Sequence, residues 1–145
     1  MSDRPNGQRS VALERLASLH EAQRDFYAGG SAEKLRAALT EDIRWTVPGS
    51  SPIAGRYEGF EEVIAYFTRR REMAARTFRM HLKEVLTGDG EHVAALTEGT
   101  AVLGGAEETW STVGLYRFRG RRVAACWLLP LDPGEFDRIW SRTAK

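Results

Sequence analysis

The spacing of apolar residues divides the chain at about residue 76, with a helical period before it and a period of two after it. The first helix is predicted over residues 11–28, where Gly29 and Gly30 supply the stop. A second, shorter helix is predicted from a cap at Ser31 through Leu39. The spaced positions of the first helix are Leu13, Leu16, Leu19, Gln23, Phe26 and Tyr27.

A third helix is predicted over residues 60–74, and its buried stripe is Phe60, Val63, Ile64 and Phe67. This helix ends close to three successive arginines, Arg69, Arg70 and Arg71. Cations suit the negative end of the helix dipole, so the favoured interpretation is a solvated helix end. A phosphate-binding patch is the alternative.

Strands are predicted from alternating side chains. A short one covers residues 43–47, where Ile43, Trp45 and Val47 share one face before the chain breaks at Pro48. Four more follow the third helix and are joined by short turns, which makes an antiparallel meander. Their ranges are 77–86, 92–103, 109–119 and 122–130, and the first turn covers 87–92.

A last short helix is predicted after Asp132, which can cap it, with Pro133 at the first helical position. The element order is therefore helix, helix, strand, helix, four strands, helix. Helices packed on one face of a mainly antiparallel sheet form an α+β fold. Residues 1–10 are expected to be a flexible tail, and residues 11–145 a single domain.

Composition narrows the possible partners. Lys and Arg total 21 and Asp and Glu total 20, so the near-zero balance gives no indication of a nucleic-acid partner. The polar amino terminus is not a signal peptide, and no apolar run is long enough to span a membrane. We expect a cytoplasmic protein.

Cysteine and histidine offer little chemistry by themselves. The single cysteine, Cys126, excludes an internal disulfide and lies in an apolar run, where a buried, unreactive thiol is the ordinary expectation. His81 and His92 are expected to be solvated. The three histidines lack metal-ligand spacing, so we expect no metal and no cofactor.

Three stretches together resemble the SnoaL-like branch of the nuclear-transport-factor-2-like superfamily. They are "FYAGGSAEKLRAALTEDIRWTVPGSSPIAGRYEGFEEVIAYF", "GDGEHVAAL" and "LYRFRGRRVAACWLLPLDPGEFDRIW". The resemblance implies a strongly curved, mainly antiparallel sheet wrapped around the N-terminal helices, forming a cone with a central pocket. It also implies a homodimer formed through the outer face of the sheet.

The same superfamily contains several enzymes and also proteins that only bind, so the fold leaves the reaction open. The resemblance to ketosteroid isomerases implies an Asp base where this chain has Val47, and a tyrosine where it has Gln23. Valine cannot transfer a proton, and an amide is a poor donor to an enolate, so we reject that mechanism.

Two residues are candidate catalytic groups. Glu98 is the one mid-strand acid of the central strands, and an apolar setting would raise its pKa if it points inward. The alternative is an outward-facing glutamate, solvated or paired across a dimer. His20 lies one turn before Gln23 and two before Tyr27, on a helix face that could line the hollow; a structural histidine is the alternative.

Aromatic side chains from several strands are expected to surround one cavity, together with a few polar groups. Such a pocket suits a flat apolar or aromatic molecule, although the rings could instead simply fill the core. The predicted ligand-binding residues are Gln23, Tyr27, Trp45, Val47, Phe67, Trp110, Thr112, Tyr116 and Trp127.

Two functions remain open from the sequence. One is an enzyme of the cyclase, isomerase or hydrolase kind that acts on a small hydrophobic substrate. The other is a non-catalytic dimeric module that binds a ligand or acts as a scaffold.

Overall fold

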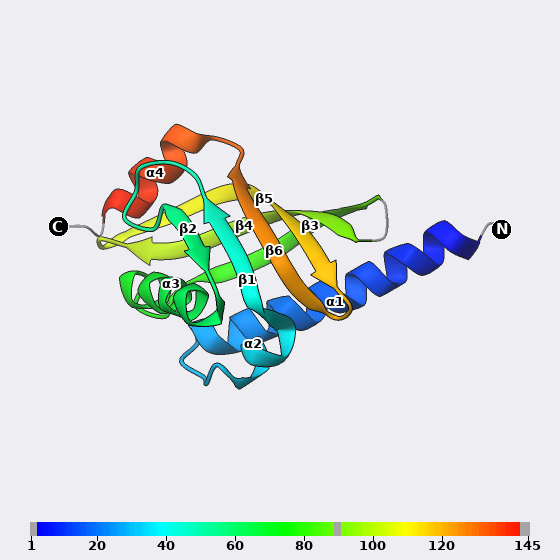
Figure 1. The fold of residues 1–145 in the computed structure, drawn as a ribbon. Coiled ribbons are helices and arrows are strands. Elements are labelled where there is room, and N and C mark those ends of the chain that lie inside the picture. The colour runs from blue at the N-terminus through cyan, green and yellow to red at the C-terminus, as the bar shows by residue number, and fades with distance from the viewer. Residues whose placement is uncertain (1–2, 89–90, 143–145) are drawn as a thin grey trace.

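The alternating segments form one curved sheet of six strands, described here from a computed structural model that covers residues 3–88 and 91–142 (Figure 1). The elements in chain order are α1 (Asp3–Tyr27), α2 (Glu33–Ala38), β1 (Leu39–Val47), β2 (Gly55–Glu58), α3 (Phe60–Met73), β3 (Arg79–Thr87), β4 (His92–Leu103), β5 (Ala106–Arg119), β6 (Arg122–Pro130) and α4 (Pro133–Ser141). The predicted α+β class is confirmed.

The strand order across the sheet is β2-β1-β6-β5-β4-β3. The predicted antiparallel meander is present as β3 to β6. Its first turn includes residues 89–90, which lie outside the described residues. Two features were not predicted: the short strand β2, which pairs antiparallel with β1, and the parallel pairing of β1 with β6.

The helices follow the sequence pattern with shifted ends. Helix α1 starts earlier than expected, at Asp3. The N-cap of α2 is Ala32, without a side-chain hydrogen bond, and the Ser31 hydroxyl only accepts a bond from the Glu33 amide at 3.4 Å. In Figure 1, α1, α2 and α3 lie along one side of the sheet. None of the helices in the described ranges combines the length and apolarity that a membrane crossing requires.

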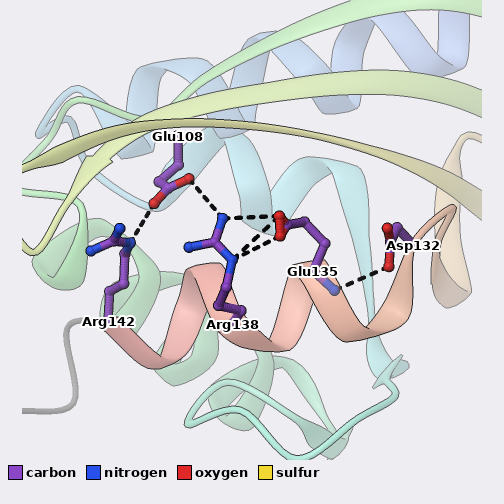
Figure 2. A network of polar contacts seen from close by, with 5 residues as sticks. All are labelled: Glu108, Asp132, Glu135, Arg138 and Arg142. Carbon is purple, nitrogen blue, oxygen red and sulfur yellow. Dashed lines mark hydrogen bonds and ion pairs between the residues drawn. The ribbon is translucent and has the colours of Figure 1, made fainter.

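Helix α4 is anchored by polar contacts at its start and along its length (Figure 2). The Asp132 side chain accepts a hydrogen bond from the Glu135 amide at 3.1 Å, which confirms the predicted cap. Further along, Arg138 forms an ion pair with Glu135 and another with Glu108 on β5, and Arg142 pairs with Glu108 as well. These contacts attach the helix to the sheet.

Aromatic rings dominate the core between the helices and the inner face of the sheet. Tyr27 stacks on Phe78 with 4.6 Å between ring centroids, and Trp45 meets Phe67 edge to face at 5.0 Å. Trp140 of α4 reaches the same cluster, 5.3 Å from Trp110. Each ring contributes large apolar area, and edge-to-face geometry adds to the attraction.

Two glycines allow rings to lie close against the strands. A Cβ at Gly99 would come within 2.6 Å of the Trp110 ring, and a Cβ at Gly114 within 2.7 Å of the Tyr116 hydroxyl. No real Cβ tolerates such contacts, so only glycine fits beneath these rings.

A register shift between β5 and β6 determines which β6 side chains face inward. Phe118 pairs with Val123, whereas Arg117 pairs with Ala125, so β6 holds one extra residue at this point. Cys126 and Leu128 are buried, and Trp127 between them is 38% exposed. Trp127 therefore lies on the outer face of the sheet.

Candidate functional site

A small internal cavity lies between the helices and the inner face of the sheet. Six of the residues predicted from the sequence line it: His20, Gln23, Trp45, Trp110, Thr112 and Tyr116. Helix α1 supplies the first two, β1 supplies Trp45, and β5 supplies the other three. The predicted convergence of aromatic and polar groups from separate elements is present at this place.

The cavity is much smaller than the hollow we expected. Its volume is about 30 Å³, whereas a pocket for an organic ligand commonly measures about 300–1,000 Å³. A water molecule needs roughly 10–15 Å³ measured in this way, so the space has room for about two waters and not for an organic molecule. In this conformation, the rings fill most of the interior.

Three other predicted residues are buried but do not line the cavity. Tyr27 and Phe67 pack against each other with ring centroids 6.0 Å apart, and Val47 is 2% exposed near the end of β1. They form part of the core that surrounds the cavity.

Two predicted residues lie on the opposite face of the sheet. In β4 the buried positions include Thr97 and Gly99, both of which line the cavity, so Glu98 between them points outward. It pairs across the strands with His81 and Ser111. Trp127 lies on the same outer face, because of the register shift in β6.

Arg70 is the main cavity residue that the sequence analysis missed. It lines the cavity and is 5% exposed, so it is not part of a solvated helix end. Its Nη1 atom donates to the Tyr66 hydroxyl at 3.0 Å, and its guanidinium lies 4.5 Å from the Phe78 ring centroid and 4.7 Å from that of Trp140. A signal was available: Phe60, Val63, Phe67 and Arg70 follow each other at intervals of three and four residues, which places Arg70 on the buried stripe.

The neighbouring arginines differ from Arg70. Arg69 is exposed and donates to the Pro52 carbonyl at 2.6 Å. Arg71 is half-buried over the Phe26 ring, 4.4 Å from its centroid, and donates to the Phe26 carbonyl at 3.4 Å. The three adjacent basic residues therefore do not form a common patch.

Three buried polar atoms at the cavity have no hydrogen-bond partner among the described residues. They are Gln23 Oε1, Trp45 Nε1 and Arg70 Nε, and each belongs to a residue that lines the cavity. Most buried polar groups in proteins are hydrogen-bonded, so these atoms are available to bond a guest.

The histidine, tyrosine and cysteine side chains at or near the cavity are held in their neutral forms. Burial, assisted by Arg24, lowers the pKa of His20 from 6.5 to about 4. Burial raises the pKa of Tyr116 and of the nearby Cys126 well above their ordinary values. Neither a tyrosinate nor a thiolate therefore forms near neutral pH, in agreement with the expectation of an unreactive Cys126.

No Asp or Glu is among the described residues that line the cavity. Proton transfer there would have to use neutral His20 or a tyrosine hydroxyl. Within residues 3–88 and 91–142, no group of three or more His, Cys, Asp and Glu side chains is arranged to hold a metal ion.

A larger groove of about 710 Å³ lies elsewhere, between α1, α2 and the β5–β6 turn. Its lining includes the charged residues Glu14, Arg15, Glu21, Lys34 and Arg121 and contains no aromatic ring. We take the internal cavity as the candidate site, because the aromatic rings and the unpartnered polar atoms converge there and not in the groove.

Solved structures support the fold. The protein Bal32a from a soil-derived mobile gene cassette is 26% identical, with a TM-score of 0.79 over 90% of this chain and 98% of that one. A cystatin-like protein of unknown function from Xanthomonas campestris is 20% identical, with a TM-score of 0.76 over 88% and 96%. TerC, co-crystallised with polyporic acid, is 14% identical, with a TM-score of 0.71 over 86% and 96%.

No curated protein sequence matches the chain. The family model for the SnoaL-like domain matches residues 20–126, from His20 at the cavity through Cys126 on β6. This match covers most of the sheet and all the predicted site residues except Trp127. The chain therefore belongs to the SnoaL-like domain family.

Proposed function

We propose that the protein binds a small, planar, largely apolar molecule in the internal cavity. The main support is the convergence of Gln23 Oε1, Trp45 Nε1 and Arg70 Nε, all without partners, on a space bordered by Trp110 and Tyr116. Flat rings provide contact area, and a few polar groups orient the guest. TerC, which shares the fold, was crystallised with polyporic acid.

Binding requires the cavity to enlarge. Met80 on β3 lines it and is only partly buried, and its unbranched side chain adapts easily to a new shape. Displacement of the Met80 side chain would enlarge the cavity between the sheet and α1. We therefore expect ligand binding to be accompanied by side-chain rearrangement and not by entry into a preformed chamber.

Binding without chemistry is the function that the residues favour. Glu98 faces away from the cavity, and Val47 is a core residue without ionisable groups. If a reaction takes place, His20 is the base that we propose, since its neutral imidazole lines the cavity. Loss of turnover with retained ligand binding in His20→Gln would identify that role.

We also propose a homodimer through the outer face of the sheet. Apolar side chains pair across adjacent strands there: Leu96 with Val113, Val113 with Leu129, and Leu115 with Trp127. Trp127 and Leu129 are 38% and 46% exposed. A second copy with the same stripe would cover them by twofold symmetry.

Light scattering coupled to size-exclusion chromatography tests the dimer. We expect Leu129→Glu to convert the wild-type dimer to a monomer, and Val11→Glu, at an exposed position on helix α1 away from the outer face of the sheet, to leave it intact. A monomeric wild type would remove the proposal. A cytoplasmic location stays a prediction from the sequence.

The ligand proposal is tested by tryptophan fluorescence in a Trp127→Phe background, which removes the exposed indole. Benzamide and benzoate serve as planar probes, and cyclohexanecarboxamide is a non-planar control. We expect saturable binding of a planar probe, weakened at least about ten-fold by Thr112→Leu, which fills the cavity, and little changed by Thr112→Val, which keeps its size.

Failure of both planar probes to bind would overturn the proposal. Binding that is unaffected by Thr112→Leu would also overturn it, because the probe would then be bound elsewhere.

A further inference from the structure

The charge on Arg70 has no anionic partner within the part of the chain that the structure describes. No carboxylate in residues 3–88 or 91–142 forms an ion pair with its guanidinium, although the side chain is almost fully buried. Its guanidinium donates a hydrogen bond to the neutral Tyr66 hydroxyl and also interacts with the neutral Tyr27 hydroxyl, and neither group supplies a negative charge. An arginine remains protonated at any ordinary pH, so the interior holds an uncompensated positive charge.

The other ionisable groups around Arg70 do not neutralise it. Burial raises the pKa values of Tyr27, Tyr66, Tyr116 and Cys126, and the guanidinium lowers each of them only in part. All four groups are therefore uncharged near pH 7. His20 on the opposite helix is also neutral, since its pKa is about 4.

Aromatic contacts hold the guanidinium in place without neutralising it. Phe78 and Trp140 lie against it, and Tyr66 lies 5.5 Å away by its ring centroid. Ring faces attract a cation, but a buried charge is ordinarily paired as well. Water in the small cavity could accept the hydrogen of Nε but would bring no opposite charge.

From this arrangement we infer that the ligand of the cavity is an anion, and specifically a planar aromatic carboxylate whose oxygens accept hydrogen bonds from Arg70. This inference rests on the proposed binding function and specifies the charge of the guest. Arg70 Nε is a donor without a partner among the described residues, and Trp45 Nε1, in the same lining, is a second. Two donors suit the two oxygens of a carboxylate, and hydrogen bonds from a charged donor are stronger than neutral ones.

The ring of such a ligand would lie against the tryptophan and tyrosine side chains of the sheet. Gln23 Oε1, an unpartnered acceptor, would take a hydrogen bond from a hydroxyl substituent. The site therefore distinguishes a hydroxylated aromatic acid from the corresponding amide or ester, which lacks the charge.

The experiment compares benzoate with benzamide, two probes of nearly the same shape that differ in charge, at pH 7 and in the Trp127→Phe background. We expect benzoate to bind at least about ten-fold more tightly. Arg70→Gln should bring the two dissociation constants to about the same value, and Arg70→Lys should retain part of the preference. Arg69→Gln, which changes the exposed neighbour, is the matched control and should leave the preference unchanged.

Different outcomes identify which statement fails. Benzamide binding as tightly as benzoate in the Trp127→Phe protein, where Arg70 is intact, would overturn the inference and leave the binding function standing. This comparison does not depend on whether any Arg70 variant folds. A preference for benzoate that survives in folded Arg70→Gln would also overturn it. If neither benzoate nor benzamide binds, both the inference and the binding function on which it rests are wrong.

Discussion

Two charged side chains are buried in the part of the chain whose burial the structure describes, and their surroundings are opposite. Glu108 on β5 is 8% exposed and is paired with both Arg138 and Arg142 at the end of α4 (Figure 2). Arg70 on α3 is buried to a similar degree, and among the described residues it contacts tyrosine hydroxyls and ring faces but no carboxylate. The first arrangement attaches a helix to a sheet; the second leaves a charge available at a cavity.

We therefore assign Glu108 a structural role and Arg70 a role in ligand binding. A buried ion that loses its partner destabilises a protein strongly, so an unpaired one persists only where another role requires it. The partners of Glu108 are half-exposed arginines that reach it from solvent. Arg70 is enclosed by rings that exclude such partners.

The largest expected effect is a loss of stability at low pH, where protonation of His20 would put a second positive charge at the cavity. The pKa of His20 is about 4 in the folded chain against an ordinary 6.5, so the unfolded chain takes up the proton first as the pH falls. Above about pH 6.5 His20 is neutral in both states and does not lower the free energy of unfolding. As the pH falls toward 4, proton uptake by the unfolded chain lowers the free energy of unfolding by about 3 kcal/mol. Urea unfolding of the wild type and of His20→Gln, measured from pH 7 to 4, should show this as the difference between the two curves. Parallel curves would mean that His20 titrates normally.

The next effect is a gain of stability on removal of the unpaired charge. Arg70→Met keeps an unbranched side chain of similar length and should raise the free energy of unfolding by about 2 kcal/mol, since desolvation of the guanidinium is no longer required. Arg69→Met at the exposed neighbouring position should change it by less than about 0.5 kcal/mol. A clear decrease in the free energy of unfolding of Arg70→Met would show that the ring contacts and the Tyr66 hydrogen bond outweigh the desolvation cost. Arg70 would then stabilise the fold, as Glu108 does.

The smallest effect has the opposite sign. Glu108→Gln preserves the shape of the side chain but removes its charge, and we expect a loss of about 1 kcal/mol, limited because Arg138 and Arg142 can return to solvent. Glu107→Gln, at an exposed position one residue earlier, is the control. If Glu108→Gln leaves the free energy of unfolding in urea unchanged, the ion pairs of Glu108 with Arg138 and Arg142 contribute nothing to stability.

Local pattern was enough to predict most of the fold, because alternation along β3 to β6 and helical spacing in α1 and α3 are properties of neighbouring residues. The pairing of β1 with β6 joins segments far apart in sequence and has no local signature. Strand β2 has only four residues and no buried position, so no apolar alternation marks it.

The site was predicted in part for the same reason. Facing positions on β1 and β5 follow from strand parity, which correctly placed Trp45, Trp110, Thr112 and Tyr116 together. One extra residue in β6 reverses the parity for Trp127, and such a bulge is not visible in the sequence. Arg70 was missed because a charge was read as a surface residue, although its spacing placed it with Val63 and Phe67.

The parallel contact between β1 and β6 has a consequence for how the chain reaches its native state. During synthesis, residues 39–58 emerge before residues 122–130, so the edge of β1 that pairs with β6 has no partner until β6 has also emerged. The sheet that carries Trp45 therefore cannot be completed before that point. Until then an aromatic strand edge is exposed to other chains, and slow elongation through β5 would prolong the interval in which aggregation competes with folding.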